Sequence, residues 1–146
     1  MSPTFRGHRG KPGAKLAMET AAHLFVYGTL RPQMTHPLGH LLVRHGILLG
    51  PGVFQGKLYD LGRYPGAVAS RKKTDLVAGE VYRLQNPERV FVVLDEYEGP
   101  RFKRTQVPIF LPEEDCLDCW IYLYVRSVSG RPIISNGDYV KYRNGA

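Results

Sequence analysis

The sequence lacks the long apolar segments that mark membrane and secreted proteins. No run of apolar residues approaches the roughly 20 that a bilayer-spanning helix needs. The first ten residues are basic, as in a signal peptide, but the apolar stretch behind them covers just residues 16–18 and is followed by Glu19. We therefore expect a cytoplasmic protein with no membrane partner.

Cysteine is scarce, and the two cysteines do not indicate a metal or redox centre. Cys116 and Cys119 form a single Cys-Leu-Asp-Cys motif, whereas a structural zinc site takes four ligands and a redox pair opens a helix after a strand. Here the motif precedes residues 120–125, whose aromatic and β-branched side chains are typical of a strand. We expect two reduced cysteines, with an adventitious disulfide as the alternative.

The histidine, serine and cysteine residues do not form a known catalytic or metal-binding motif. His36 and His40 have the i, i+4 spacing of a metal pair, but Pro37 lies between them and no acidic motif accompanies them. No serine or cysteine occupies the Gly-x-Ser-x-Gly elbow of hydrolases. The sequence therefore predicts neither a metal site nor a covalent nucleophile.

Positive charge is in excess, with a net charge of +7. The residues before Leu24 contribute four basic side chains against Glu19 alone, a net +3, and leave +4 for the rest of the chain. A basic protein invites a nucleic-acid function, but the remaining charges are scattered, apart from residues 71–73, and no aromatic–basic repeat of the RNA-recognition type is present. We expect weak attraction of polyanions and no specific nucleic-acid partner; the oligomeric state is left open.

Patterning predicts one domain preceded by a tail. Residues 1–22 are rich in Gly, Pro, Lys and Arg and are expected to form a flexible basic tail, and residues 23–146 one domain, because 43% of the chain is hydrophobic. Helices are expected at residues 38–45 and 87–97, the second with Asn86 as its N-cap. Strands are expected at residues 24–27, 47–49, 53–61, 67–69, 77–84, 102–111 and 119–126. The fold class is thus α+β, with a curled or closed mixed sheet and few short helices.

The most informative segment is Phe-Val-Tyr-Gly-Thr-Leu-Arg at residues 25–31, an apolar strand that breaks at a glycine. Gly28 can adopt backbone angles closed to other residues and turn the chain sharply. The N–H groups of Gly28, Thr29 and Leu30 can then converge on a carboxylate or an oxyanion. Arg31 adds a neighbouring positive charge or faces solvent. A tight turn without a ligand is the alternative for this segment.

A second segment, Leu-Asp-Glu-Tyr-Glu-Gly at residues 94–99, places acids where a helix should end. The C-terminal end of a helix carries partial negative charge, so the pKa of a carboxyl there should rise, which suits a general acid/base near neutral pH. Asp95 and Glu96 are expected to face solvent, whereas Glu98, next to Gly99, can turn into a cleft. Glu80 is the second candidate acid, although an ion pair is its better interpretation.

The chain resembles the γ-glutamylcyclotransferase-like family, in particular its small bacterial and archaeal branch and the related γ-glutamylamine cyclotransferases. The resemblance covers about residues 24–142 and rests on six motifs in the family's order. They are Val-Tyr-Gly-Thr-Leu-Arg at 26–31, Leu-Tyr-Asp-Leu-Gly-Arg-Tyr-Pro-Gly-Ala at 58–67, Gly-Glu-Val-Tyr at 79–82, the acidic motif at 94–99, Trp-Ile-Tyr-Leu-Tyr at 120–124 and Asn-Gly-Asp-Tyr at 136–139.

The resemblance implies a small mixed β-barrel with flanking helices and a cavity at one side. It implies that Gly28, Thr29 and Leu30 hold a γ-glutamyl group, that Tyr27, Tyr64 and Tyr124 form the wall, and that Glu98 is the acid/base. The implied reaction closes the γ-glutamyl group to 5-oxoproline and releases an amine or amino acid, with no metal or organic cofactor. Many members have Tyr where this chain has Phe102, so a non-catalytic protein that binds a small acidic metabolite is the alternative.

Overall fold

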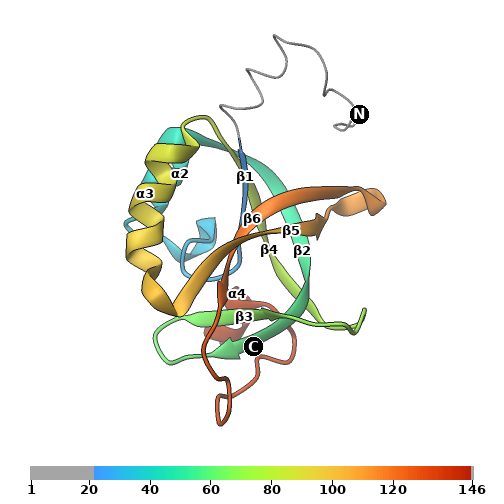
Figure 1. Cartoon of the computed structure of the whole chain (residues 1–146). Helices are drawn as coiled ribbons and strands as arrows, with labels where there is room; N and C mark the ends of the chain where they lie inside the picture. The colour runs from blue at the N-terminus through green and yellow to red at the C-terminus, as the bar shows by residue number, and fades with distance from the viewer. Residues whose placement is uncertain (1–21, 146) are drawn as a thin grey trace.

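The computed structural model describes residues 22–145 (Figure 1). The expected tail therefore lies outside the described residues except for Ala22, which is already the first residue of a strand. The sheet contains six strands. They are β1 (Ala22–Val26), β2 (Gly46–Asp60), β3 (Pro65–Ala69), β4 (Leu76–Leu84), β5 (Phe102–Phe110) and β6 (Cys116–Tyr124).

Five of these strands close into a barrel, which confirms the predicted fold class. β1 pairs antiparallel with β4, β4 with β2, and β5 with β6. Two short contacts complete the ring: Val53 of β2 faces Phe110 of β5, and Leu24 of β1 lies parallel to Trp120 of β6. β3 lies outside the ring and joins β2 to β6. The closed barrel brings the ends of strands that are distant in sequence to one place.

The helices are few and short, as expected. They are α2 (Gly39–His45), α3 (Pro87–Glu98) and α4 (Tyr139–Arg143), with single 3-10 turns η1 (Pro32–Met34), η2 (Gly99–Arg101) and η3 (Pro112–Glu114). α2 and α3 lie together on one side of the barrel (Figure 1). Asn86 is the N-cap residue of α3, but its side chain makes no capping hydrogen bond; its amide nitrogen lies 3.4 Å from His45 Nδ1. No helix among residues 22–145 is long and apolar enough to cross a membrane.

The apolar residues form two clusters on opposite faces of the barrel wall. One cluster fills the barrel with side chains from every barrel strand, including Phe25 and Ile121. The other lies between the barrel and α2 and α3, and it includes Leu24 and Leu94. Neighbouring residues of a strand point to opposite faces, so Leu24 and Phe25 belong to different clusters. This two-sided burial explains why the β1 sequence is apolar without alternation.

The structure corrects two of the expected strand boundaries. β2 runs unbroken through Gly50-Pro51-Gly52, which the sequence analysis took as a separator of two strands. A register shift between Leu48 and Gly50, where Gly50 has a φ of 137°, carries the strand past the proline. β6 begins at Cys116 rather than at residue 119, because residues 116–119 pair with the end of β5. Both cysteines are free, Cys116 exposed and Cys119 buried.

Candidate active site

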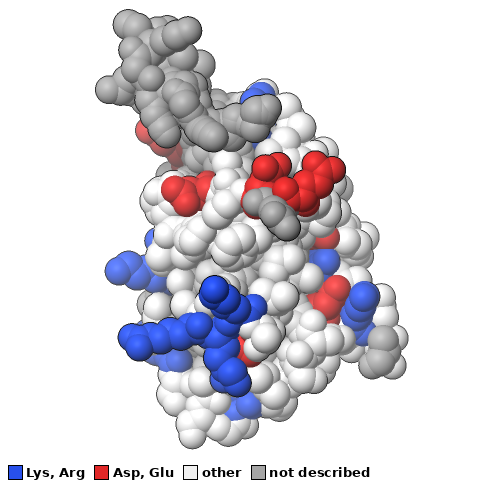
Figure 2. Space-filling view, turned by 90° about the vertical axis from the view of Figure 1, so that its right-hand side faces the viewer, with Lys and Arg blue, Asp and Glu red and all other residues white. Residues whose placement is uncertain are grey.

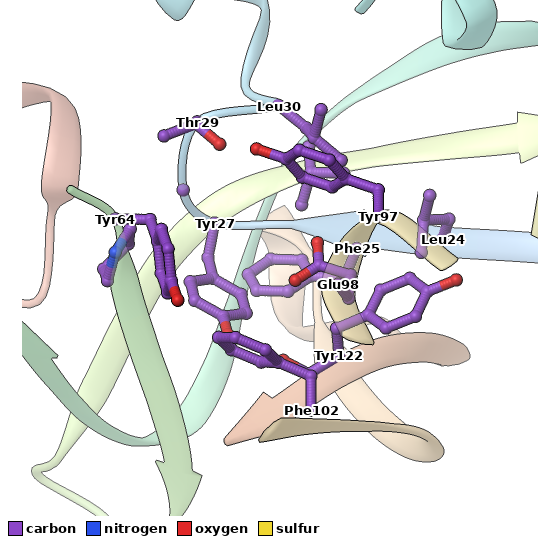
Figure 3. Close-up of a pocket in the computed structure, with 13 residues that line it drawn as sticks. Leu24, Phe25, Tyr27, Thr29, Leu30, Tyr64, Tyr97, Glu98, Phe102 and Tyr122 are labelled. Atoms are coloured by element: carbon purple, nitrogen blue, oxygen red, sulfur yellow. The ribbon is translucent and has the colours of Figure 1, made fainter. Parts of the chain in front are cut away.

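A cavity of about 120 Å³ lies where the end of β1, the start of β3 and the end of α3 meet (Figure 3). Its wall includes six of the seven residues predicted for the site: Tyr27, Gly28, Thr29, Leu30, Tyr64 and Glu98. Tyr124 is not among the lining residues. Its ring packs at 5.4 Å against Phe102, which lines the cavity in front of it. The structure thus brings together two segments that are separated by about seventy residues in the sequence.

The cradle, the loop formed by Gly28, Thr29 and Leu30, has backbone N–H groups without acceptors among the described residues. β1 ends at Val26, and the chain then turns so that Arg31 N–H donates to the Gly28 carbonyl at 3.1 Å. Within residues 22–145, the N–H groups of Gly28, Thr29 and Leu30 donate to no backbone or side-chain acceptor. Backbone N–H groups without a protein acceptor can bind an anion or a developing oxyanion.

Gly28 is needed here for space rather than for unusual backbone angles. The sequence analysis assigned it a conformation closed to other residues, but Gly28 is not among the glycines with positive φ. A Cβ atom at this position would instead lie 2.9 Å from Pro65 Cγ and 3.0 Å from Pro65 Cδ. Glycine therefore allows the cradle loop to lie directly against the start of β3.

Glu98 is the last residue of α3, one residue beyond the predicted helix end. Gly99 follows with a φ of 76°, and its N–H closes the helix on the Asp95 carbonyl. Burial alone raises the pKa of the Glu98 carboxyl from 4.5 to about 7. The raised pKa was expected, but from the helix end rather than from desolvation. Figure 3 shows the carboxylate between the rings of Phe25, Tyr27 and Tyr97.

Tyr27 forms part of the wall with its hydroxyl already engaged. Its Oη donates to the Tyr122 carbonyl at 2.6 Å and accepts the Ala67 N–H at 3.2 Å. Burial, together with the nearby Glu98 charge, raises the pKa of this phenol far above its ordinary value. Tyr27 is therefore a fixed neutral group next to Glu98 and cannot serve as a second acid/base.

Arg31 does not contribute a positive charge to the cavity. Its guanidinium is buried and donates to both carboxylate oxygens of Glu80 at 2.8 and 2.9 Å and to Asp138 at 2.9 Å. The ion pair expected for Glu80 is confirmed, and its partner is the Arg31 guanidinium. Among the described residues, no Lys, Arg or His lines the cavity, so an anion bound there by these residues would depend on N–H and O–H donors.

The sequence analysis missed several residues of the wall. Tyr97 and Tyr122 line the cavity, and so does Phe102, which the family comparison noted only as a departure. The Tyr122 hydroxyl donates at 2.6 Å to Asp95, which also binds Arg104 at 2.9 Å. Asp95 is exposed, as expected, but it is paired, and these hydrogen bonds lower its pKa despite partial burial. The one available signal was position: Tyr97 adjoins Glu98, and Tyr122 alternates with Tyr124 along β6.

Among residues 22–145, no group of three or more His, Cys, Asp or Glu side chains is placed to hold a metal ion. The cavity is small and rich in aromatic side chains, and it holds one carboxyl whose pKa is near neutrality. Beside that carboxyl lie backbone donors without acceptors. This arrangement can move a proton and stabilise negative charge on a bound molecule.

Comparison with known proteins gives a consistent result. The model of a family described as gamma-glutamyl cyclotransferase, AIG2-like, matches residues 24–141. The gamma-glutamylcyclotransferase family protein YtfP of Escherichia coli K12 is 32% identical over 117 residues, 80% of this chain and 95% of its own length. The solution structure of ytfP from Escherichia coli superposes with a TM-score of 0.57 at 31% identity, over 83% of this chain and 98% of the other. The crystal structure of an AIG2-like protein from Mus musculus gives a TM-score of 0.63 at 25% identity, over 82% and 88%.

Proposed function

The chain belongs to the gamma-glutamyl cyclotransferase, AIG2-like family, and we propose that it cyclises a γ-glutamyl amide or amine to 5-oxoproline. Glu98 carries the proposal. It is the one acidic residue among those lining the cavity, and its pKa is about 7 because it is buried. A carboxyl with that pKa can both accept and return a proton near neutral pH.

The proposed reaction needs one proton carrier. The neutral α-amine of the γ-glutamyl group attacks the γ-carbonyl carbon, and a C–N bond forms as the ring closes. Glu98 accepts a proton from the attacking nitrogen and returns it to the departing nitrogen when the original amide bond breaks. The products are 5-oxoproline and a free amine or amino acid, so atoms and charge balance without a cofactor.

The N–H groups of Gly28, Thr29 and Leu30 support this chemistry by binding negative charge on the substrate. A preorganised donor to an oxyanion typically contributes about 3 kcal/mol of transition-state stabilisation. Tyr27 and Tyr64 would confine the γ-glutamyl group. Tyr64 is held from outside by Arg101, whose guanidinium donates to the phenol oxygen at 3.1 Å.

The test is release of 5-oxoproline from γ-glutamyl amino acids, γ-glutamyl amines and glutathione. Wild type should release it from at least one compound, and Glu98→Gln should lower the rate by about 10²-fold or more. Glu96→Gln, on an exposed position of the same helix, is the matched control and should retain full activity. Equal rates in wild type and Glu98→Gln, or no release from any compound, would contradict the proposal.

A binding protein without turnover is the second candidate. Phe102 favours it, because this position of the wall offers hydrocarbon where a hydroxyl would contact a substrate. In that case the same compounds would raise the melting temperature without releasing 5-oxoproline.

A further inference from the structure

Tyr97 lies between the end of α3, which carries Glu98, and the cradle loop. Its ring extends from the end of α3 toward the cradle loop, and Figure 3 shows its hydroxyl on the side of Thr29 and Leu30. The hydroxyl oxygen lies 3.0 Å from Nε2 of His36, which follows η1 in the same loop. The two rings meet edge to face at 5.2 Å. Tyr97 is therefore both a wall residue and the partner of the loop that carries the cradle.

The hydrogen bonds of His36 determine which atom donates in this pair. The backbone N–H of Leu38 donates to His36 Nδ1 at 3.0 Å, so Nδ1 must present a lone pair. A neutral imidazole with a lone pair on Nδ1 carries its proton on Nε2. The Nε2–H group then donates to the Tyr97 oxygen. The hydroxyl proton of Tyr97 is left over, and within residues 22–145 no acceptor lies in hydrogen-bonding distance of it.

We propose that Tyr97 is a hydrogen-bond donor to a substrate carboxylate and that His36 is the positioning residue that orients its hydroxyl. The proposal rests on the proposed function, since it takes the carboxylate to be that of the γ-glutamyl group. Because the lining residues include no Lys, Arg or His, a bound carboxylate depends on neutral donors. Tyr97 supplies one such donor, and charge-assisted hydrogen bonds are stronger than neutral ones.

The first experiment measures KM and kcat for Tyr97→Phe, which removes the hydroxyl and keeps the ring. A donor to a carboxylate acts in the ground state and the transition state alike, so KM should rise by about tenfold to a hundredfold while kcat stays within about twofold. Tyr142→Phe is the matched control, because it removes a hydroxyl bonded to Asp60 at 2.6 Å outside the cavity. An unchanged KM in Tyr97→Phe, or a loss confined to kcat, would overturn the assignment.

The second experiment separates positioning from general damage to the loop. His36→Ala should raise KM, and His36→Gln should restore most of the loss because its amide N–H can replace the Nε2 donor. Adding His36→Ala to Tyr97→Phe should produce little further change, since His36 acts through the hydroxyl that is already absent. His40→Ala, at an exposed histidine of α2, is the control. Additive effects, or no rescue by Gln, would show that His36 only supports the loop.

A binding measurement keeps this inference separate from the reaction. Glu98→Gln should turn over slowly enough under the proposed mechanism for its affinity for a γ-glutamyl amino acid to be measured by calorimetry, with and without Tyr97→Phe. The inference predicts binding that Tyr97→Phe weakens by about tenfold or more, even if wild type releases no 5-oxoproline. Binding that Tyr97→Phe leaves unchanged, or no binding to either protein, would overturn it.

Discussion

Glu98 and Glu80 are both withdrawn from solvent, but their surroundings differ in kind. Glu80 accepts two hydrogen bonds from Arg31 and a third from Gln33 at 3.0 Å. Burial is the one cause of the raised pKa of Glu98. A carboxyl that is desolvated without a partner can change its protonation state near neutral pH. The two residues therefore suit different roles: Glu80 forms an ion pair, and Glu98 is the residue proposed to transfer a proton.

The raised pKa of Glu98 predicts a pH-dependent stability. Between pH 4.5 and about 7 the folded protein keeps a proton that the unfolded chain has already released, so the free energy of unfolding falls as pH rises. The loss should reach about 3 kcal/mol, because each pKa unit corresponds to about 1.4 kcal/mol. Glu98→Gln should lack this decline and be the more stable protein at pH 8. Urea unfolding of both proteins from pH 4 to 8 measures it, and parallel curves would contradict the prediction.

The close packing of Gly28 against Pro65 predicts that a larger residue at this position destabilises the fold. Gly28→Ala places a methyl group against Pro65, which lies at 2.9 Å, and should cost about 1–3 kcal/mol and displace the cradle. Gly39→Ala is the control, because no atom lies within 4 Å of its Cβ position, and it should be neutral or slightly stabilising. Thermal melts and activity assays of the two variants compare them. Equal behaviour would mean that the loop has room for a side chain.

At the scale of elements, Arg31 ties three parts of the chain together. Arg31 follows the cradle and binds Glu80 of β4 and Asp138. Asp138 is the N-cap of α4 and also accepts the Lys141 N–H. The orientation of the cradle loop thus depends on an ion-pair cluster behind it. A buried cation that loses one partner retains its desolvation cost, so each partner matters more than an exposed ion pair would.

Glu80→Gln should therefore destabilise the fold, in contrast to the same change at Glu98. It leaves the buried Arg31 with Asp138 as its one remaining anion, and we expect a loss of about 3 kcal/mol in the free energy of unfolding. Urea unfolding at pH 8 compares Glu80→Gln, Glu98→Gln and the exposed control Glu96→Gln. A Glu80→Gln variant as stable as wild type would show that the cluster contributes little.

The sequence predicted elements well where local chemistry marks their ends. α3 is bounded by Asn86-Pro87 and by Gly99-Pro100, and its observed end differs by one residue from the prediction. β2 was misread because its central Gly-Pro-Gly has the chemistry of a turn. Gly52 in fact lies at the barrel interior, where a Cβ would approach Ile109 to 2.8 Å. That requirement comes from a distant strand and leaves no local signal.

At the scale of the whole molecule, the site exists because the barrel closes. The cradle and Glu98 were each predictable from a local motif, and the family resemblance joined them. The contacts that set their chemistry are long-range: Arg31 with Glu80, Tyr27 with the Tyr122 carbonyl, and Tyr97 with His36. Such pairs depend on which strands become neighbours, so the sequence could name the candidate residues but not their partners.

Charge provides the last prediction at this scale. The residues before Leu24 carry four basic side chains and one acid, whereas the face of the described body in Figure 2 carries acidic as well as basic groups. Acidic groups on a surface weaken its attraction for a polyanion, so we expect the basic side chains before Leu24 to dominate that attraction. Deleting residues 2–20, which leaves β1 intact, should therefore weaken binding to duplex DNA and reduce the slope of log K against log salt by about 3. The melting temperature and the rate of 5-oxoproline release should stay unchanged, because both core clusters and the cavity are formed by residues 22–142. A truncated protein that binds DNA as tightly as the full chain would place polyanion binding on the barrel. One that also loses activity would show that the first twenty residues contribute to the site.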